Sequence, residues 1–160
     1  MDVGATTALV ARITLAAAFA LSAGTKLAHR KAFAAALDDF GVPRSAAVAP
    51  VLPLIEAALA GLLLAVRDRP WPAFMAIAVL ALFTGAVVAN LLGDTPAPCP
   101  CFGPPRADAP PVSTATVARN GYLVGLAVLG TGSTAGASGG ATAAIAAVTV
   151  AVTFFLLLRE

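Results

Sequence analysis

Charged side chains are scarce in this chain of 160 residues, which has 10 Lys or Arg and 8 Asp or Glu, 11% of the total. A soluble domain has about 25% charged residues, which form the shell between its core and water. Hydrophobic residues make up 59% of the chain, and its mean hydropathy is +0.91. This composition excludes both a soluble domain and a disordered one, so we expect a membrane protein.

Basic runs, cysteine and histidine are scarce as well. The net charge of +2 is spread along the chain without a run of the kind that binds nucleic acid. The chain has two cysteines and one histidine, so a tetrahedral zinc site within it would need carboxylate ligands. We therefore expect neither a nucleic-acid partner nor a structural zinc site.

Long apolar stretches cover most of the chain. A spanning helix needs about 20 predominantly apolar residues. Five stretches approach this length: residues 5–27, 48–66, 71–92, 115–130 and 141–158. Arg119 and Asn120 interrupt the fourth, which we expect to be tilted or partly re-entrant. The pattern predicts an all-α, multi-pass transmembrane helical bundle: a four-helix domain over residues 1–130, a small-residue linker at 131–140 and a fifth helix at 141–158.

One segment between these stretches is too polar to span. Phe33, Leu37 and Phe40 recur there at helical spacing and give a short helix one apolar stripe. Gly41 and Pro43 are typical of a helix end. We expect an amphipathic helix over residues 30–41 that lies along the membrane interface.

The first apolar stretch allows a second interpretation. Arg12, the apolar residues 13–21 and the small residues 22–24 also resemble a signal peptide with its cleavage region. Most lipoproteins carry a cysteine at such a site, and none is present here. Cleavage would also separate Lys26 from the span that it ends. We favour a retained first span.

Ionisable residues within apolar spans are costly and are candidate functional residues by default. Glu56 lies near the middle of the second span, where its carboxyl must be protonated or paired with a cation. Helices threaded alternately bring four polar residues toward one face: Lys26, Asn90, Arg119 and Asn120. Glu56 lies about 12 Å below that face. We expect it to pair with Lys26 or Arg119; the alternative roles are a structural pair that sets helix register, or a protonated acid.

Two further basic residues lie close to the ends of the first span. Arg12 is nearer the opposite face and is expected to extend its charged end to the interface. His29 lies just outside the span beside Arg30 and Lys31. We expect it to be a solvated neighbour of lipid headgroups.

Both cysteines lie in a Pro98-Cys99-Pro100-Cys101-Phe102-Gly103 segment, within the connection 93–114 between the third and fourth spans. A pair separated by one residue closes only a small, strained disulfide ring, which is easily reduced and staples little. Arg119 or Lys26 on the same face favours the reactive thiolate. The spacing therefore indicates thiol redox chemistry. The alternatives are a soft-metal site at Cys99 and Cys101, or a pair without reactivity.

Several of these residues occur in the order typical of a known family. The chain resembles the methylamine utilisation protein MauE family, part of the wider DoxX-like group of small membrane bundles. The resemblance covers residues 6–130, and its most specific part is Cys-x-Cys-Phe-Gly followed by Arg-Asn. The matching residues are Ser22, Lys26-Leu27, Phe33, Leu37, Phe40-Gly41, Leu52-Pro53, Glu56, Cys99, Cys101-Phe102-Gly103 and Arg119-Asn120.

The resemblance implies a redox-associated protein of the cell membrane that supports maturation of an exported protein. In the family, that client is the methylamine dehydrogenase β-subunit. A generic thiol–disulfide role toward an exported client or a thioredoxin-like partner is the equal expectation, with a quinone as a possible electron acceptor. The alternatives are soft-metal transport and a structural subunit of a membrane oxidoreductase.

The orientation of the cysteine connection is predicted differently by two arguments. Basic residues at the N-terminal face are Arg67 and Arg69, whereas those at the cysteine face are Arg30, Lys31, Arg44, Arg106 and Arg159. The positive-inside rule then puts the cysteines in the cytoplasm. Oxidation of exported proteins needs the opposite orientation. We expect the outer face, because much of the basic surplus lies in the interfacial segment.

Overall fold

The computed structural model describes residues 2–93, 112–135, 137 and 140–158. Over these residues the chain is helical and forms no strand, which confirms the predicted all-α class. The helices, in chain order, are α1 (Val3–Ala28), α2 (Arg30–Asp39), α3 (Ser45–Ala65), α4 (Trp71–Leu91), α5 (Thr114–Leu129) and α6 (Gly140–Leu158).

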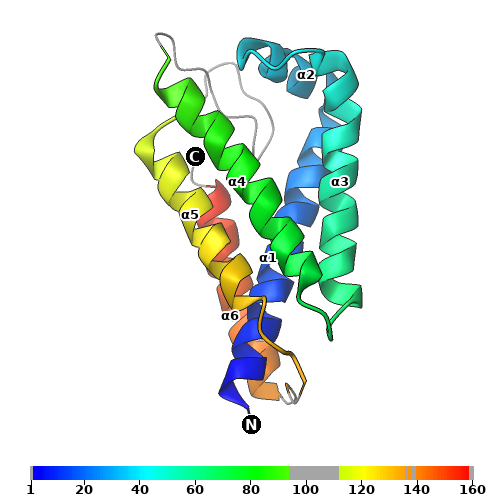
Figure 1. Ribbon diagram of the computed structural model, residues 1–160, viewed down its shortest axis with the longest axis vertical. Helices are drawn as coiled ribbons and strands as arrows, with labels where there is room; N and C mark the ends of the chain where they lie inside the picture. The colour runs from blue at the N-terminus through cyan, green and yellow to red at the C-terminus, as the bar shows by residue number, and fades with distance from the viewer. Residues whose placement is uncertain (1, 94–111, 136, 138–139, 159–160) are drawn as a thin grey trace.

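Helix α1 is the centre of the bundle (Figure 1). It packs most extensively against α3 and also contacts α5 and α6, while α4 and α5 pack against each other. The short helix α2 lies across one end and rests on α3. Large apolar side chains from four helices fill the core: Leu15, Phe19, Leu59, Leu63, Leu80 and Leu123.

Three helices, α1, α3 and α4, are long and apolar enough to cross a membrane. They correspond to the predicted spans at 5–27, 48–66 and 71–92. The predicted fourth span is one continuous helix through Arg119 and Asn120, but its 16 residues make it about 24 Å long, less than the ~30 Å hydrocarbon core. The predicted fifth span is the helix α6, in which the described apolar stretch is Ala143–Phe154.

The predicted interfacial helix is present as α2. It ends as its sequence suggests, because Gly41 has a φ of +73° and the Val42 amide donates to the Leu37 carbonyl, 2.9 Å away. Its apolar stripe is occupied by protein, since Phe33 and Leu37 are buried in a cluster with Ala49 of α3. The apolar stripe therefore packs on α3, and the position of α2 along the membrane interface stays a prediction.

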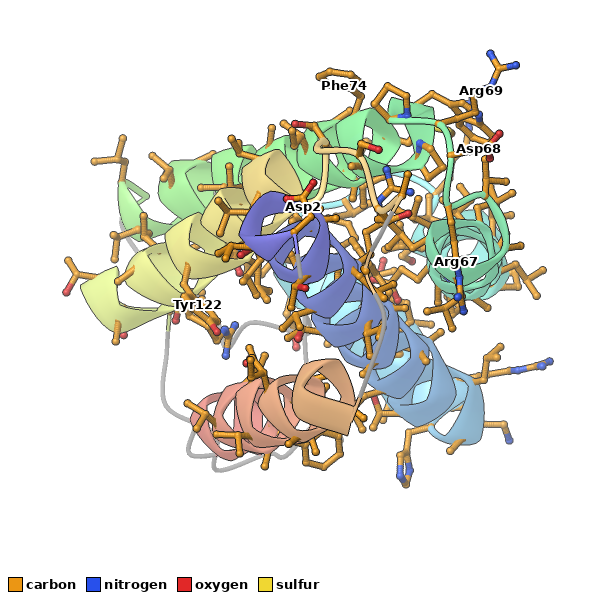
Figure 2. The ribbon with its side chains drawn as sticks, turned by 90° about the horizontal axis from the view of Figure 1, so that it is seen from below. Asp2, Arg67, Asp68, Arg69, Phe74 and Tyr122 are labelled. Atoms are coloured by element: carbon orange, nitrogen blue, oxygen red, sulfur yellow. The ribbon has the colours of Figure 1, made fainter. Side chains whose placement is uncertain are left out.

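Helix α6 joins the bundle through α1 and α5. Figure 2 shows Tyr122 of α5 directed toward α6, where its hydroxyl lies 3.1 Å from Thr153 Oγ1. Hydrogen bonds between hydroxyl groups help to join helices where neighbouring surfaces are apolar.

The ends of the helices determine which polar residues are neighbours. Helices α1 and α4 end, and α5 begins, at the end of the bundle where α2 lies (Figure 1). This arrangement confirms that Lys26, Asn90, Arg119 and Asn120 approach one face. The opposite end holds the N-terminus and the α3–α4 turn, labelled by Asp2 and by residues 67–69 in Figure 2.

Candidate functional site

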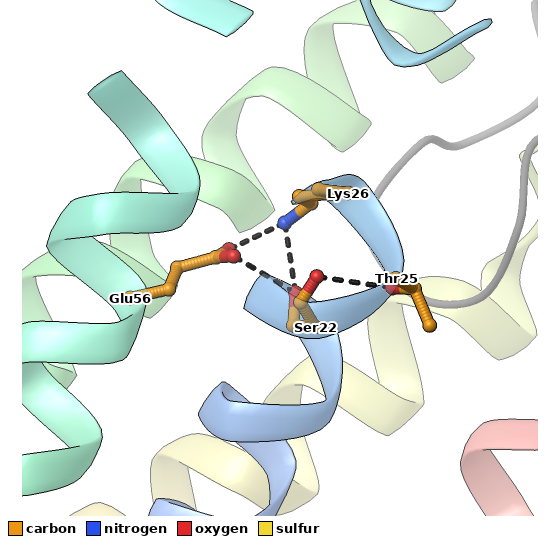
Figure 3. Close-up of polar contacts among 4 residues, drawn as sticks. All are labelled: Ser22, Thr25, Lys26 and Glu56. Carbon is orange, nitrogen blue, oxygen red and sulfur yellow. Dashed lines mark hydrogen bonds and ion pairs between the residues drawn. The ribbon is translucent and has the colours of Figure 1, made fainter. Parts of the chain in front are cut away.

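A closed hydrogen-bonded triad of Ser22, Lys26 and Glu56 links α1 to α3 (Figure 3). The ammonium of Lys26 lies 2.5 Å from Glu56 Oε1 and donates a second hydrogen bond of 2.8 Å to Ser22 Oγ. The Ser22 hydroxyl in turn donates to Glu56 Oε2, 3.1 Å away. All three side chains are buried, with exposed fractions of 2% or less. Of the two predicted partners for Glu56, the structure selects Lys26.

The positions of the three residues along their helices explain how the triad forms. Ser22 and Lys26 are four residues apart, so they lie on the same face of α1 one turn from each other. Glu56 is close to the middle of α3 and continues the buried stripe of Pro53, Leu59 and Leu63. The helix pair that packs most closely therefore brings the two charges together.

Two aromatic rings complete the surroundings of the Lys26 ammonium. The ring centroids of Phe33 in α2 and Phe83 in α4 lie 5.4 and 5.2 Å from Nζ. The negative face of an aromatic ring attracts a cation at such distances. Four helices thus contribute to the environment of one buried ammonium group.

The geometry of the triad matches a structural pair that holds two helices in register. Both carboxylate oxygens of Glu56 accept hydrogen bonds, and the hydroxyl of Ser22 both donates and accepts. A buried charge is tolerated when its partner and hydrogen bonds are in place, and the pair as a whole is neutral. A direct part of Lys26 or Glu56 in redox chemistry stays a prediction.

Arg12 forms a second buried polar centre near the opposite end of α1. Its guanidinium donates to the carbonyls of Gly130 (2.7 Å), Val66 (2.8 Å), Arg67 (3.1 Å) and Arg69 (2.9 Å). The side chain is 1% exposed, and its charged end reaches the α3–α4 turn at this end of the bundle. Its extension to the membrane interface stays a prediction. Val66 and Gly130 cap the ends of α3 and α5, and Arg67 and Arg69 lie in the α3–α4 turn. Carbonyls at helix ends lack partners within their own helix, and the five donors of arginine satisfy several such carbonyls at once.

Sequence reasoning missed this role of Arg12. The usable signal was a basic residue about two turns inside an apolar span, without a matching acid, because such a cation needs some other acceptor. The acceptors are main-chain carbonyls, which every residue has, so the sequence does not identify them. Only the arrangement of α1 against the ends of α3 and α5 reveals them.

The remaining predicted site residues lie near the start of α5 and the end of α4. Asn90 and Arg119 are half-buried. Asn120 is 1% exposed, and neither polar atom of its amide has a hydrogen-bond partner among the residues that the structure describes. Asn120 lies on the same buried stripe as Leu123 and Ala127, so its amide is directed into the bundle.

The two cysteines, Cys99 and Cys101, lie outside the described residues, as does most of the connection 93–114. Within the described part of the chain, no three His, Cys, Asp or Glu side chains come together as a metal ion would require. His29 is exposed beside α2, in agreement with its expected solvation.

The three spanning helices and the buried charges between them define a small helical membrane protein. The sequence model of the family described as methylamine utilisation protein MauE matches residues 4–133. The chain belongs to this family. Helix α6 lies beyond the matched region.

One curated relative supports the same assignment. The methylamine utilization protein MauE of Paracoccus denitrificans is 38% identical to this chain over 122 residues. The alignment covers 73% of this chain and 64% of the relative. The chain thus matches slightly less than two thirds of that protein's length. The comparison with solved structures gave no significant match.

Proposed function

We propose that this protein is a membrane thiol–disulfide exchange protein that supports disulfide formation or maturation of an exported protein. Cys99 and Cys101 are the proposed exchanging pair. The observation that carries the proposal is that only one residue separates the two cysteines. They lie on the connection between α4 and α5, the helices that carry Asn90, Arg119 and Asn120. A thiol of the client attacks the Cys99–Cys101 disulfide, and a mixed disulfide forms.

The proposed exchange oxidises the client in one step and reoxidises the cysteine pair in another. A second client thiol attacks the mixed disulfide. The client then has one new disulfide, and Cys99 and Cys101 are reduced to two thiols. Two electrons and two protons then pass to an acceptor, for which a lipid-soluble quinone is the proposed class, and the disulfide is restored. The proposed client is an exported subunit of a methylamine-oxidising enzyme, which the name of the family supports. Another exported protein is the alternative client.

The charges of the bundle support a division of roles. Glu56 already balances the ammonium of Lys26 through a direct contact. Arg119, in the second turn of α5, is therefore the proposed source of positive charge for a cysteine thiolate. The proposed roles of Asn90 and Asn120 are polar contacts at the same end.

The test compares the wild type with Cys99→Ser, Cys101→Ser and the double variant, and Thr95→Ala in the same connection serves as the control. One single variant should accumulate a mixed disulfide with the client on a non-reducing gel, because the resolving thiol is missing. The double variant should form none, while its amount in the membrane stays unchanged. Normal client disulfides in the double variant would overturn the proposal.

The same variants address orientation and the competing metal function. We propose that the connection faces outward, so a membrane-impermeant maleimide should label the reduced cysteines in intact cells. Purified reduced protein that binds Cu(I) more tightly than the double variant, with client disulfides unaffected, would instead support soft-metal handling.

A further inference from the structure

The corner between α1 and α2 carries three consecutive basic residues. His29, Arg30 and Lys31, which we call the basic corner, are all exposed. They line a shallow pocket formed by residues 27–32. No acidic residue interrupts them, so the corner is a local concentration of positive charge.

The cations of the basic corner have no partner within the described part of the chain. No ion pair or side-chain hydrogen bond involves Arg30 or Lys31 there. The α3–α4 turn at the opposite end differs. Arg67 Nε donates to the Leu64 carbonyl at 3.1 Å, and Arg69 Nε lies 3.8 Å from Asp68 Oδ2 (Figure 2 shows this turn).

The stability of α2 does not explain the arrangement of its charges. Arg30 and Lys31 occupy its first turn, and Asp38 and Asp39 its last. Cations near the start of a helix and anions near its end oppose the helix dipole. Asp38 accepts a hydrogen bond from Ser45 of the next helix, so it is engaged away from the basic corner.

The neighbouring helix places the basic corner at the depth of lipid headgroups. Helix α1 is long and apolar enough to cross the membrane, and it ends at Ala28, directly before the corner. The apolar face of α2 is filled by α3, so no apolar stripe of α2 remains to enter the lipid. Contact between α2 and the membrane must therefore come from charge.

We propose that the basic corner binds the phosphate groups of anionic phospholipids at the membrane surface. The charge complementarity is direct: two unpaired cations and an imidazole face a layer of phosphodiesters. Each Lys or Arg close to an anionic lipid surface strengthens binding about fivefold. The corner therefore enriches anionic lipid at the end of the bundle where α4 ends and α5 begins.

The test measures lipid retention by the full-length protein in detergent micelles, by native mass spectrometry. Phosphatidylglycerol is the anionic probe and phosphatidylcholine the neutral one. The variants are Arg30→Gln with Lys31→Gln and, as the matched control, Arg67→Gln with Arg69→Gln. Removal of two cations from the corner should weaken phosphatidylglycerol binding roughly 25-fold. The control pair should change it by less than about twofold, and phosphatidylcholine binding should stay the same.

Two further measurements distinguish the loss of positive charge from a loss of folded structure. The charge-preserving variant Arg30→Lys with Lys31→Arg should retain binding, and the circular dichroism of all variants should match the wild type. Equal losses in both glutamine pairs, or equal retention of the two lipids, would overturn the proposal. Displacement of phosphatidylglycerol by an equal concentration of inorganic phosphate would also overturn it, because the site would then serve a soluble anion.

Discussion

Two buried cations on one helix are compensated in different ways. Lys26, near the end of α1, meets a carboxylate, a hydroxyl and two aromatic rings. Arg12, about 21 Å earlier along the same helix, meets four main-chain carbonyls. The first centre is neutral overall and joins two helices midway along α3, whereas the second keeps its charge and lies at helix ends.

The difference follows from the chemistry of the two side chains. An ammonium is a compact point charge that one carboxylate can neutralise, whereas a planar guanidinium presents five donors in a fixed fork. Carbonyls at helix ends need donors and carry no charge, so an arginine suits them. A net charge is tolerated better near the interface than in the middle of a bundle. The comparison leads to three predictions, in decreasing order of effect.

Substitution Glu56→Gln should have the largest effect, because it leaves the buried Lys26 ammonium without its counter-charge. We expect a loss of about 3–5 kcal/mol in the free energy of unfolding, measured by thermal unfolding in detergent. The double variant Glu56→Gln with Lys26→Met removes both charges and should recover much of that loss. Additive losses in the double variant would show that the two residues do not stabilise one another.

Substitution Arg12→Lys should cost about 2 kcal/mol, because one ammonium cannot reach four carbonyls that belong to separate segments. The positive charge is retained in this variant, so the loss of stability measures the contribution of the guanidinium hydrogen bonds. Arg67→Lys is the matched control, since Arg67 is exposed, and should change stability by less than about 0.5 kcal/mol. A similar stability in both variants would contradict a role for the fork.

Substitution Phe83→Leu should have the smallest effect, about 1 kcal/mol, through loss of its attraction for the Lys26 ammonium. The control is Phe74→Leu at an exposed position of the same helix. In the background Glu56→Gln with Lys26→Met, the difference between Phe83→Leu and its control should shrink, because no cation remains. An unchanged difference would indicate that Phe83 acts through packing alone.

Much of the fold followed from simple patterns. Hydropathy predicted the three spanning helices, and Gly41 predicted the end of α2. The ion pair was predicted as one of two choices, because Lys26 and Arg119 both approach Glu56 along their helices. The contact of Lys26 with Phe83 was missed, since no local pattern relates two residues that are 57 positions apart and lie on different helices.

The sequence by itself determined the class of this protein and its family, because hydropathy, helix length and short motifs are properties of consecutive residues. It also determined that Glu56 needs a partner, since an isolated charge in an apolar span is too costly. Only the tertiary structure decided that the partner is Lys26, and that Arg12 binds the ends of α3 and α5. These choices depend on which helix faces touch, and main-chain carbonyls are the same in every residue, so no local pattern encodes them.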